Sequence, residues 1–433
     1  MKKDKKILIV SYYWPPAGGP GVQRWLKFVK YLPDFGWKPA VFIPENPSYP
    51  LTDETLCSEV PADLEVIKSP IWEPYQLAEL FGKQNKKFKA GQFDVGKKQS
   101  WKSKISIWIR GNFFIPDARV FWVRPSVKKL KKYLAEHPVE VLVTTGPPHS
   151  MHLIGLQLKK DFPDLRWVAD FRDPWTEISY YKHLKLTAAA DRKHRRLEKQ
   201  VFQKADLTLA TSYSDAENFR NLGANAYCIT NGFDGSPYKK GKEAHSEKFT
   251  ICYAGVLEQL RNPEILWSEL QQLADQNLAF KEDLKIVFAG RADEHILHDL
   301  KNSSLSDSVE TPGYLPHQQA NEQMRKADLL LLTNFTQPTS RGIIPGKLFE
   351  YLASGTEIIS FGPAESDVAR ILLETKAGRH FSYTEEQEVS AFILQQYERW
   401  KRREELKEKR HIDQFTRKNL TGKLAELLNT LAS

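Results

Sequence analysis

The sequence is poor in cysteine and has no long apolar run. Its three cysteines, Cys57, Cys228 and Cys252, are spread over 433 residues, too few and too scattered for a disulfide framework or a metal knuckle. This usage favours a reducing, cytoplasmic setting. No apolar run approaches the roughly 18 residues that a membrane-spanning helix needs. The basic start, MKKDKK, is followed by only four apolar residues before Ser11, which is too short for the core of a signal peptide, roughly 7–15 residues long.

A recognised nucleic-acid-binding module is also lacking, although the chain carries a formal net charge of +9. The excess is confined to the first half. Residues before Asn231 include 37 basic and 24 acidic side chains, and the remainder includes 26 and 30. Residues 83–110 alone contain eight Lys, one Arg and a single acid. A basic half suits nucleic acid, an anionic membrane or an acidic substrate. Without a module or an evident aromatic stacking platform, no nucleic-acid partner is expected.

Short, continuous apolar runs alternate with helical stretches along the chain. Such runs are typical of parallel strands that helices cover on both faces. The predicted strands are Ile7–Val10, Pro39–Ile43, Val139–Thr144, Trp167–Asp170, Leu207–Ala210, Thr250–Tyr253, Lys285–Ala289, Leu329–Leu332 and Glu357–Ser360. The pattern predicts an α/β fold with two doubly wound, Rossmann-like domains.

A stretch rich in Gly, Ser, Pro and charge, residues 235–248, predicts the boundary between these domains. We expect an N-terminal domain over residues 1–232, interrupted by a basic, aromatic insertion at about 72–125. The second domain is expected over residues 249–400. Residues 401–433 are predicted to be helical and to pack back toward the N-terminal domain.

Three segments of the first domain carry candidate groups at strand ends. The first strand leads into a Gly-rich turn with Gly18 and Gly19 before a helix. Such a turn lets a phosphate or sugar approach the backbone, and its alternative is an ordinary tight turn. The third glycine of a dinucleotide fingerprint is replaced by Arg24, so a dinucleotide site is not predicted. His149 follows another strand, where it could transfer a proton or bind an anion, or simply start a helix.

The third segment follows strand Trp167–Asp170 and contains two acids that flank an arginine. Asp170 and Asp173 could bind sugar hydroxyls, or could orient the Arg172 guanidinium by bidentate pairing. The alternative is a structural ion pair.

Glycines also end strands in the second domain. Gly255 and Gly290 each follow an apolar run, Arg261 precedes a helix, and Gly313-Tyr314 follows a short strand-like segment. Backbone without side chains at a strand end permits close approach of a ligand.

A predicted helix begins at Gly346 and is capped by Gly355. Its N-terminus, with Lys347 in the first turn, would face a phosphate. Glu350 lies one turn later on the same face and could hold a ribose diol. The alternative is an ordinary capped amphipathic helix.

Taken in order, these segments resemble the retaining GT-B glycosyltransferases of family 4, over nearly the whole chain. The most specific parts are the Gly-rich opening, the junction ITNGFD at 229–234 and the helix Lys347–Gly355. The segment DFRDPW at 170–175 resembles a subgroup of bacterial polysaccharide enzymes. The resemblance implies a nucleotide-diphosphate sugar in the cleft between two domains, held mostly by the second, hexosyltransferase-type chemistry, and no metal or other cofactor.

The resemblance also assigns roles to residues. Arg261 and Lys347 would neutralise the diphosphate as it leaves, with His149 near the reacting sugar, and these three are the implied catalytic residues. The implied donor-binding residues are Gly18, Gly19, Gly255, Arg261, Gly290, Gly313, Tyr314, Gly346, Lys347 and Glu350. The implied acceptor-side residues are Asp170, Arg172 and Asp173.

One position departs from the family. Its signature has two Glu residues separated by seven others, and counting back from Glu350 puts the first at Gly342. The acidic contact to the donor sugar is therefore missing or replaced, with the N–H groups of Ile343 and Ile344 as candidates.

The acceptor is expected to be a glycan or a lipid-linked sugar in cell-surface polysaccharide synthesis. The setting would be the cytoplasm or the inner face of the cytoplasmic membrane. Residues 101–123 mix Trp and Phe with Lys and Arg and, with the Lys cluster before them, could lie in an anionic headgroup region. The alternative is a solvated basic loop with its aromatic residues packed in the core. Two other functions stay open: a nucleotide-sugar epimerase of the same architecture, and a non-catalytic, nucleotide-binding peripheral membrane protein.

Overall fold

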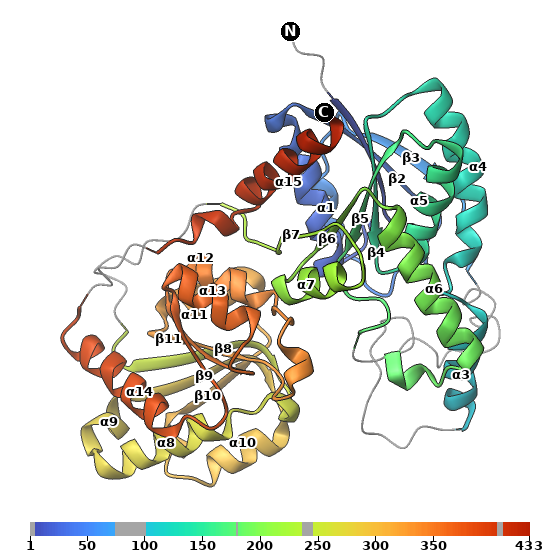
Figure 1. The fold of residues 1–433 in the computed structure, drawn as a ribbon. Coiled ribbons are helices and arrows are strands. Elements are labelled where there is room, and N and C mark those ends of the chain that lie inside the picture. Colours follow the sequence, from blue (N-terminus) through green and yellow to red (C-terminus); the bar gives the residue numbers. More distant parts are fainter. Residues whose placement is uncertain (1–4, 74–100, 179–180, 236–245, 405–409) are drawn as a thin grey trace. The chain divides into compact units, whose positions relative to one another are not determined.

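The chain forms two compact units, each a parallel β-sheet covered by helices (Figure 1). The computed structural model describes residues 5–73, 101–178, 181–235, 246–404 and 410–433. Unit 1 consists of Met1–Thr230 and Arg417–Ser433, and unit 2 of Asn231–Thr416. None of the described helices is long and apolar enough to cross a membrane.

The described part of unit 1 contains a seven-stranded sheet in the order β3-β2-β1-β4-β5-β6-β7. Its strands are β1 (Lys5–Val10), β2 (Trp37–Pro44), β3 (Glu65–Ser69), β4 (Val141–Gly146), β5 (Arg166–Phe171), β6 (Leu207–Ala210) and β7 (Ala226–Cys228). Its α-helices are α1 (Pro20–Tyr31), α3 (Trp101–Phe113), α4 (Val120–Glu136), α5 (Ser150–Asp161), α6 (Ala188–Lys204), α7 (Tyr213–Asn221) and α15 (Arg417–Ala432).

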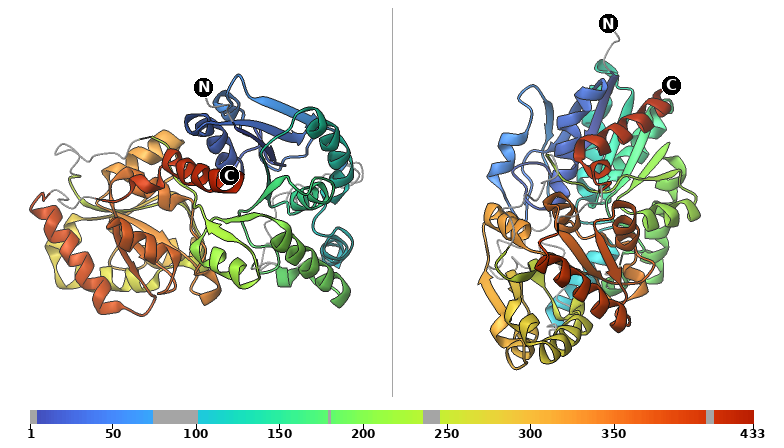
Figure 2. Two further views of the ribbon diagram at one scale, coloured as in Figure 1. Left: turned by 45° about the horizontal axis from the view of Figure 1, so that its top comes forward. Right: turned by 90° about the vertical axis from the view of Figure 1, so that its left-hand side faces the viewer.

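Alternate residues of β1 belong to two different buried clusters of unit 1. Ile7 and Ile9 pack in the cluster that includes residues of α1 and α15, and Leu8 and Val10 in the cluster that includes residues of α4 and α5. All four side chains are fully buried, which explains why this strand reads as a continuous apolar run. The last helix, α15, packs beside α1 (Figure 2), and Arg417 at its start donates to the carbonyl and side-chain oxygens of Gln23.

The described part of unit 2 contains a six-stranded sheet in the order β10-β9-β8-β11-β12-β13. Its strands are β8 (Phe249–Leu257), β9 (Leu284–Ala292), β10 (Val309–Gly313), β11 (Leu329–Thr333), β12 (Glu357–Phe361) and β13 (Gly378–Phe381). Its α-helices are α8 (Glu264–Gln276), α9 (Leu278–Asp283), α10 (Glu294–Lys301), α11 (His317–Lys326), α12 (Lys347–Ser354), α13 (Asp367–Thr375) and α14 (Glu386–Lys401). The predicted C-terminal segment is thus divided, because residues up to Thr416 belong to unit 2 and α15 belongs to unit 1.

The prediction of an α/β fold with two Rossmann-like domains is confirmed. All pairs of the described strands are parallel, and in both sheets the strand order reverses at the first strand, beside β1 and beside β8. In such sheets ligands bind at the carboxyl ends of the strands next to this reversal. The predicted site residues lie in the last part of β5, β8, β9 and β10 or follow the ends of β1, β4, β5, β8, β10 and β11, which places them on these two edges.

Candidate functional site

The Gly-rich turn after β1 brings backbone close to two neighbouring segments. Gly19 has a φ of 92° immediately before α1, a conformation that side chains disfavour. A Cβ at Gly18 would lie 3.0 Å from the Leu51 side chain, and one at Gly21 would lie 2.3 Å from Arg172 Nη1. The glycines therefore allow the turn to pack tightly within unit 1. This packing is compatible both with a turn that admits a phosphate or sugar and with an ordinary tight turn.

Arg172 connects the start of α1 to the loop after β4. Its guanidinium donates to the Gly21 carbonyl at 2.6 Å and to the carbonyls of Gly146 and Pro147. Burial lowers the pKa of Arg172, yet an arginine stays charged. The predicted pairing with its flanking acids is wrong for Asp170, whose ion pair is with Arg24. Asp173 is exposed at the surface of unit 1.

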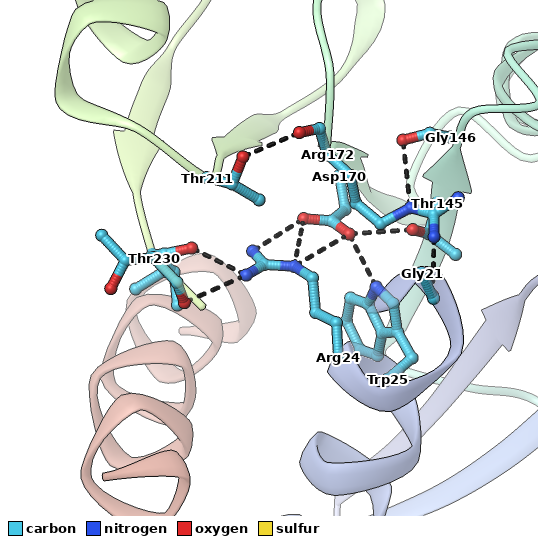
Figure 3. A network of polar contacts seen from close by, with 10 residues as sticks. Gly21, Arg24, Trp25, Thr145, Gly146, Asp170, Arg172, Thr211 and Thr230 are labelled. Carbon is cyan, nitrogen blue, oxygen red and sulfur yellow. Dashed lines mark hydrogen bonds and ion pairs between the residues drawn. The ribbon is translucent and has the colours of Figure 1, made fainter. Parts of the chain in front are cut away.

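Asp170 is fully buried at the end of β5, in a network of donors (Figure 3). Both of its oxygens accept hydrogen bonds from the Arg24 guanidinium, at 2.9–3.3 Å. Oδ2 also accepts from Trp25 Nε1 at 2.7 Å and from Thr145 Oγ1 at 2.9 Å. Because protein donors occupy both oxygens, the geometry favours the structural ion pair over contact with a sugar hydroxyl.

His149 lies buried between β4 and α5. Its ring stacks on Trp175 with centroids 5.2 Å apart and an interplanar angle of 6°. Burial, with smaller contributions from His152 and Arg172, holds the pKa of His149 well below its usual value. The imidazole is therefore neutral at physiological pH, and it can donate or accept a hydrogen bond without carrying charge.

In unit 2, Gly255 and Gly290 are paired across β8 and β9. They have φ values of 111° and 139°, and a Cβ at Gly290 would lie 2.2 Å from the Gly255 carbonyl oxygen. A Cβ at Gly255 would lie 3.2 Å from Lys347 Nζ. Glycine at 290 thus allows the two strand ends to lie close together, and glycine at 255 leaves room for the ammonium group of Lys347.

Lys347 is the first residue of α12, and its ammonium group is held beside an aromatic ring and a second cation. The Nζ atom lies 3.9 Å from the centroid of the Tyr253 ring. Burial and the nearby Arg261 guanidinium lower the pKa of Lys347 to about 7. Arg261 is held by the Val256 carbonyl and the Glu258 carboxylate, at 3.2 and 3.1 Å. The two cations lie near each other, with the Glu258 carboxylate paired to Arg261, and two neighbouring cations suit a diphosphate.

Helix α12 itself agrees with the predicted helix. Gly346 is its N-cap without a side-chain cap, and Gly355 ends it in the left-handed conformation with a φ of 73°. The N-terminal N–H groups of such a helix favour an anion. Glu350 lies one turn along and is exposed.

The remaining donor-side residues are at the end of β10 and in the loop before α12. Gly313 has a φ of 76°, and the Tyr314 side chain after it is 91% exposed, so it is accessible for stacking on a base. The Ile343 N–H, one candidate replacement for the missing Glu, donates to the Ser340 carbonyl at 2.9 Å, which leaves Ile344 as the better candidate.

Within each unit, the structure therefore brings part of the predicted set together. In unit 2 these are Gly255, Gly290, Arg261 and Lys347. In unit 1, Arg172 links the Gly-rich turn to the loop that carries His149. Sequence patterns did not indicate Tyr253, whose ring lies beside Lys347, because it belongs to an apolar strand that also serves the core.

Part of the chain, within unit 2, matches a known protein family. Residues 248–398 match the model of the family described as Glycosyl transferases group 1. A search of curated proteins found no match.

Among solved structures, the whole chain is similar to three proteins that share its fold. Sucrose-phosphate synthase from Thermosynechococcus elongatus is 13% identical, with a TM-score of 0.56 and 99% of both chains covered. Anabaena HepE in complex with UDP-glucose is 16% identical, with a TM-score of 0.52 and 99% of this chain and 97% of that chain covered. WaaG, a glycosyltransferase involved in lipopolysaccharide biosynthesis, is 12% identical, with a TM-score of 0.52 and 98% and 99% covered. The family model matches residues of unit 2 alone, and the three structures share the fold of the whole chain.

Proposed function

We propose that the protein is a retaining glycosyltransferase of the family-4 type, which moves a hexosyl group from a nucleotide-diphosphate sugar to a glycan or lipid-linked acceptor. The observation that carries this proposal is the pair of cations formed by Arg261, in the turn after β8, and Lys347, at the start of α12, within residues that match group 1 glycosyltransferases. We place the reaction in cell-surface polysaccharide synthesis, in the cytoplasm or at the inner face of the cytoplasmic membrane, with no bound metal or other cofactor.

In the proposed reaction the bond between the anomeric carbon and the diphosphate oxygen breaks, and the diphosphate leaves with the electron pair. The developing negative charge is offset by Arg261, by Lys347 and by the N–H groups at the start of α12. The acceptor hydroxyl attacks from the face that the diphosphate leaves, so the anomeric configuration is retained, and its proton passes to the departing oxygen. Glu350 would bind the ribose and Tyr314 the base. From unit 1, the neutral His149 would hydrogen-bond the transferred sugar.

A screen of nucleotide-sugar donors tests this proposal, beginning with UDP-glucose because it is bound in the HepE structure. We expect slow hydrolysis that releases the nucleotide diphosphate from one donor class, and faster release when the acceptor is present. Proton NMR of the transferred sugar should show the donor's anomeric configuration. A fold alone does not decide between a transferase and an epimerase. Conversion of one UDP-sugar into another without acceptor would identify an epimerase, and nucleotide binding without turnover of any donor would identify a non-catalytic protein.

The lowered pKa of Lys347 predicts that nucleotide affinity depends on pH. In the free protein this pKa is about 7, and a bound diphosphate raises it because negative charge favours the ammonium form. Binding above pH 7 therefore takes up a proton, and the affinity for UDP is expected to fall about fivefold from pH 7 to 8 and about tenfold from pH 8 to 9. Calorimetric titration at pH 7, 8 and 9 measures this slope.

The matched variant is Lys347→Arg, whose guanidinium stays protonated throughout that range. Its UDP affinity should be nearly flat between pH 7 and 9. An unchanged slope in this variant would assign the pH dependence to another group.

A further inference from the structure

A buried ion pair joins the two ends of the insertion between β3 and α4, and we call this pair the ionic stem. Glu73 and Arg119, at its two ends, form an ion pair with Nε and Oε1 3.2 Å apart. Glu73 also accepts hydrogen bonds from Tyr12 Oη at 2.8 Å and from the Ser48 N–H at 2.7 Å. Tyr12 follows β1 and precedes the Gly-rich turn. The ends of the insertion are therefore fixed to the edge of the sheet that carries the candidate site of unit 1.

A second contact holds the same stem to α5. Asp117 accepts hydrogen bonds from the Ser150 N–H at 2.9 Å and from Ser150 Oγ at 2.8 Å. Ser150 is the first residue of α5 and directly follows His149. The C-terminal end of the insertion is thus hydrogen-bonded to the residue that follows His149.

The described part of the insertion presents apolar side chains to solvent. We call these the aromatic surface: Trp72, Ile105, Trp108, Ile109, Phe113 and Phe121. Ile105, Trp108, Ile109 and Phe113 follow a helical spacing that puts them on one face of α3. The rings also touch, with centroids 5.7 Å apart for Trp108 and Phe113 and 5.0 Å apart for Trp72 and Phe121. Exposed fractions of 67% for Phe113 and 49% for Trp72 are large for side chains that normally pack inside.

Neither sequence alternative for residues 101–123 therefore describes the whole segment. Ile107, Ile115 and Trp122 are buried, as a packed insertion requires, whereas the aromatic surface is exposed. The Lys cluster at residues 83–100 lies outside the described residues.

Exposed basic side chains lie on the two segments that contact α3. Asn112 on α3 accepts a hydrogen bond from the Thr187 N–H at 2.7 Å and donates to the Lys185 carbonyl, which brings residues 182–187 against α3. Lys182 and Lys185 on this segment are exposed. Helix α6, which also contacts α3, adds an exposed basic set: Arg192, Lys193, Arg196 and Lys199.

The acids of α6 do not neutralise this set. Asp191 is paired with Arg195 and accepts from Tyr181. Glu198 is buried and accepts from the Thr176 N–H and hydroxyl. The rim of the aromatic surface thus has a net positive charge.

We propose that the aromatic surface docks unit 1 on an anionic lipid bilayer. Aromatic and aliphatic side chains enter the headgroup region while lysine and arginine at the rim bind acidic lipids. A second copy of the chain would bring basic rims together, and like charges disfavour that contact. The ionic stem then holds the edge of the sheet with His149 at a fixed place relative to the lipid. That consequence, presentation of a lipid-linked acceptor, rests on the proposed function, whereas the docking itself does not.

Sedimentation with vesicles tests the proposal on the full-length protein. We expect strong binding to vesicles of equal parts phosphatidylcholine and phosphatidylglycerol, weak binding to phosphatidylcholine alone, and release at about 0.5 M NaCl, where the screening length is roughly 4 Å. The double variant Trp108→Ser/Phe113→Ser should bind at least about tenfold more weakly. The matched control, Leu278→Ser/Leu373→Ser, removes two exposed apolar side chains of unit 2 and should bind like the wild type.

A second set of variants tests whether vesicle binding depends on the basic residues of the rim or only on the net charge of the chain. Lys182→Glu and Lys185→Glu should each weaken binding by about fivefold, and Lys301→Glu and Lys326→Glu in unit 2 should not. Equal binding to both kinds of vesicle, or equal loss in the controls, overturns the proposal. Dissociation of a dimer by Trp108→Ser/Phe113→Ser would instead assign the surface to a second copy. Donor hydrolysis by the wild-type protein without vesicles tests the proposed function separately.

Discussion

Replacement of Lys347 by alanine is expected to lower kcat/KM for sugar transfer by about 10²–10³-fold, which corresponds to roughly 3–4 kcal/mol of transition-state stabilisation. The proposed chemistry builds negative charge on the leaving diphosphate. The Lys347 ammonium group lies at the start of α12 and over Gly255, beside Arg261. Preorganised charge of this kind acts mainly where charge develops, so kcat should fall along with kcat/KM. Steady-state kinetics with the donor found in the screen measure both.

The stability of this variant separates catalysis from folding. Burial depresses the pKa of Lys347 from 10.5 to about 7, so the unfolded chain binds more protons between these values. The charged lysine therefore lowers the free energy of unfolding. This cost is complete below pH 7, decreases as the pH rises, and is absent above pH 10.5. At pH 7.5, Lys347→Ala should unfold at the same temperature as the wild type or a higher one. Lys326→Ala, an exposed lysine on α11, is the matched control and should keep activity within about twofold. A stable Lys347→Ala protein with full activity would exclude the assigned role.

The fold could be predicted because buried parallel strands leave a simple signal. All nine predicted strands are present, some with extended bounds. Among the described strands, β3, β7 and β13 were not predicted and β10 was indicated only as a short strand-like segment. All four lie at an edge of their sheet. An edge strand is only partly buried, as the exposed Glu65 and Tyr227 show, and so it lacks a continuous apolar run.

The candidate site was predictable to the extent that local sequence determines it. Helix α12, with its unblocked start and Gly355 cap, depends on neighbouring residues alone. The partner of Asp170 does not, because Arg24 lies 146 positions earlier and meets it only where α1 crosses the end of β5. In the sequence, Arg24 was noted only because it replaces the third glycine of a dinucleotide fingerprint.

The sequence of the basic insertion did not indicate that Glu73 and Arg119 pair at its ends, since their pairing follows from the packing of α4 on the sheet.

Replacement of Asp170 by asparagine is expected to destabilise unit 1 by about 3–5 kcal/mol, which corresponds to a fall in unfolding temperature of roughly 10 °C. Every contact to the two carboxylate oxygens comes from a donor: Arg24, Trp25 and Thr145. An amide keeps the shape but turns one acceptor into a donor, and leaves the Arg24 charge without its counter-ion. Thermal unfolding followed by circular dichroism measures the change.

The matched control is Asp161→Asn. Asp161 forms an ion pair with Lys131 at 2.8 Å, but both side chains are more than two-fifths exposed, so its loss should cost at most about 0.5–1 kcal/mol. An equal fall in unfolding temperature for Asp161→Asn and Asp170→Asn would mean that burial of the Asp170 network does not increase its contribution to stability.

A double replacement decides whether Asp170 is structural or faces an acceptor. Arg24→Met/Asp170→Leu removes both charges together, and buried pairs replaced in this way usually regain most of the lost stability. Arg24 also donates to the Ile229 and Thr230 carbonyls, at 2.7 and 3.2 Å, just where the chain leaves unit 1 (Figure 3). If the network is structural, the double variant should be more stable than Asp170→Asn and should keep the donor hydrolysis rate. Recovered stability together with lost transfer to the acceptor, at an unchanged rate of donor hydrolysis, would instead make Asp170 an acceptor-side residue, reached only after a rearrangement of the Arg24 pair.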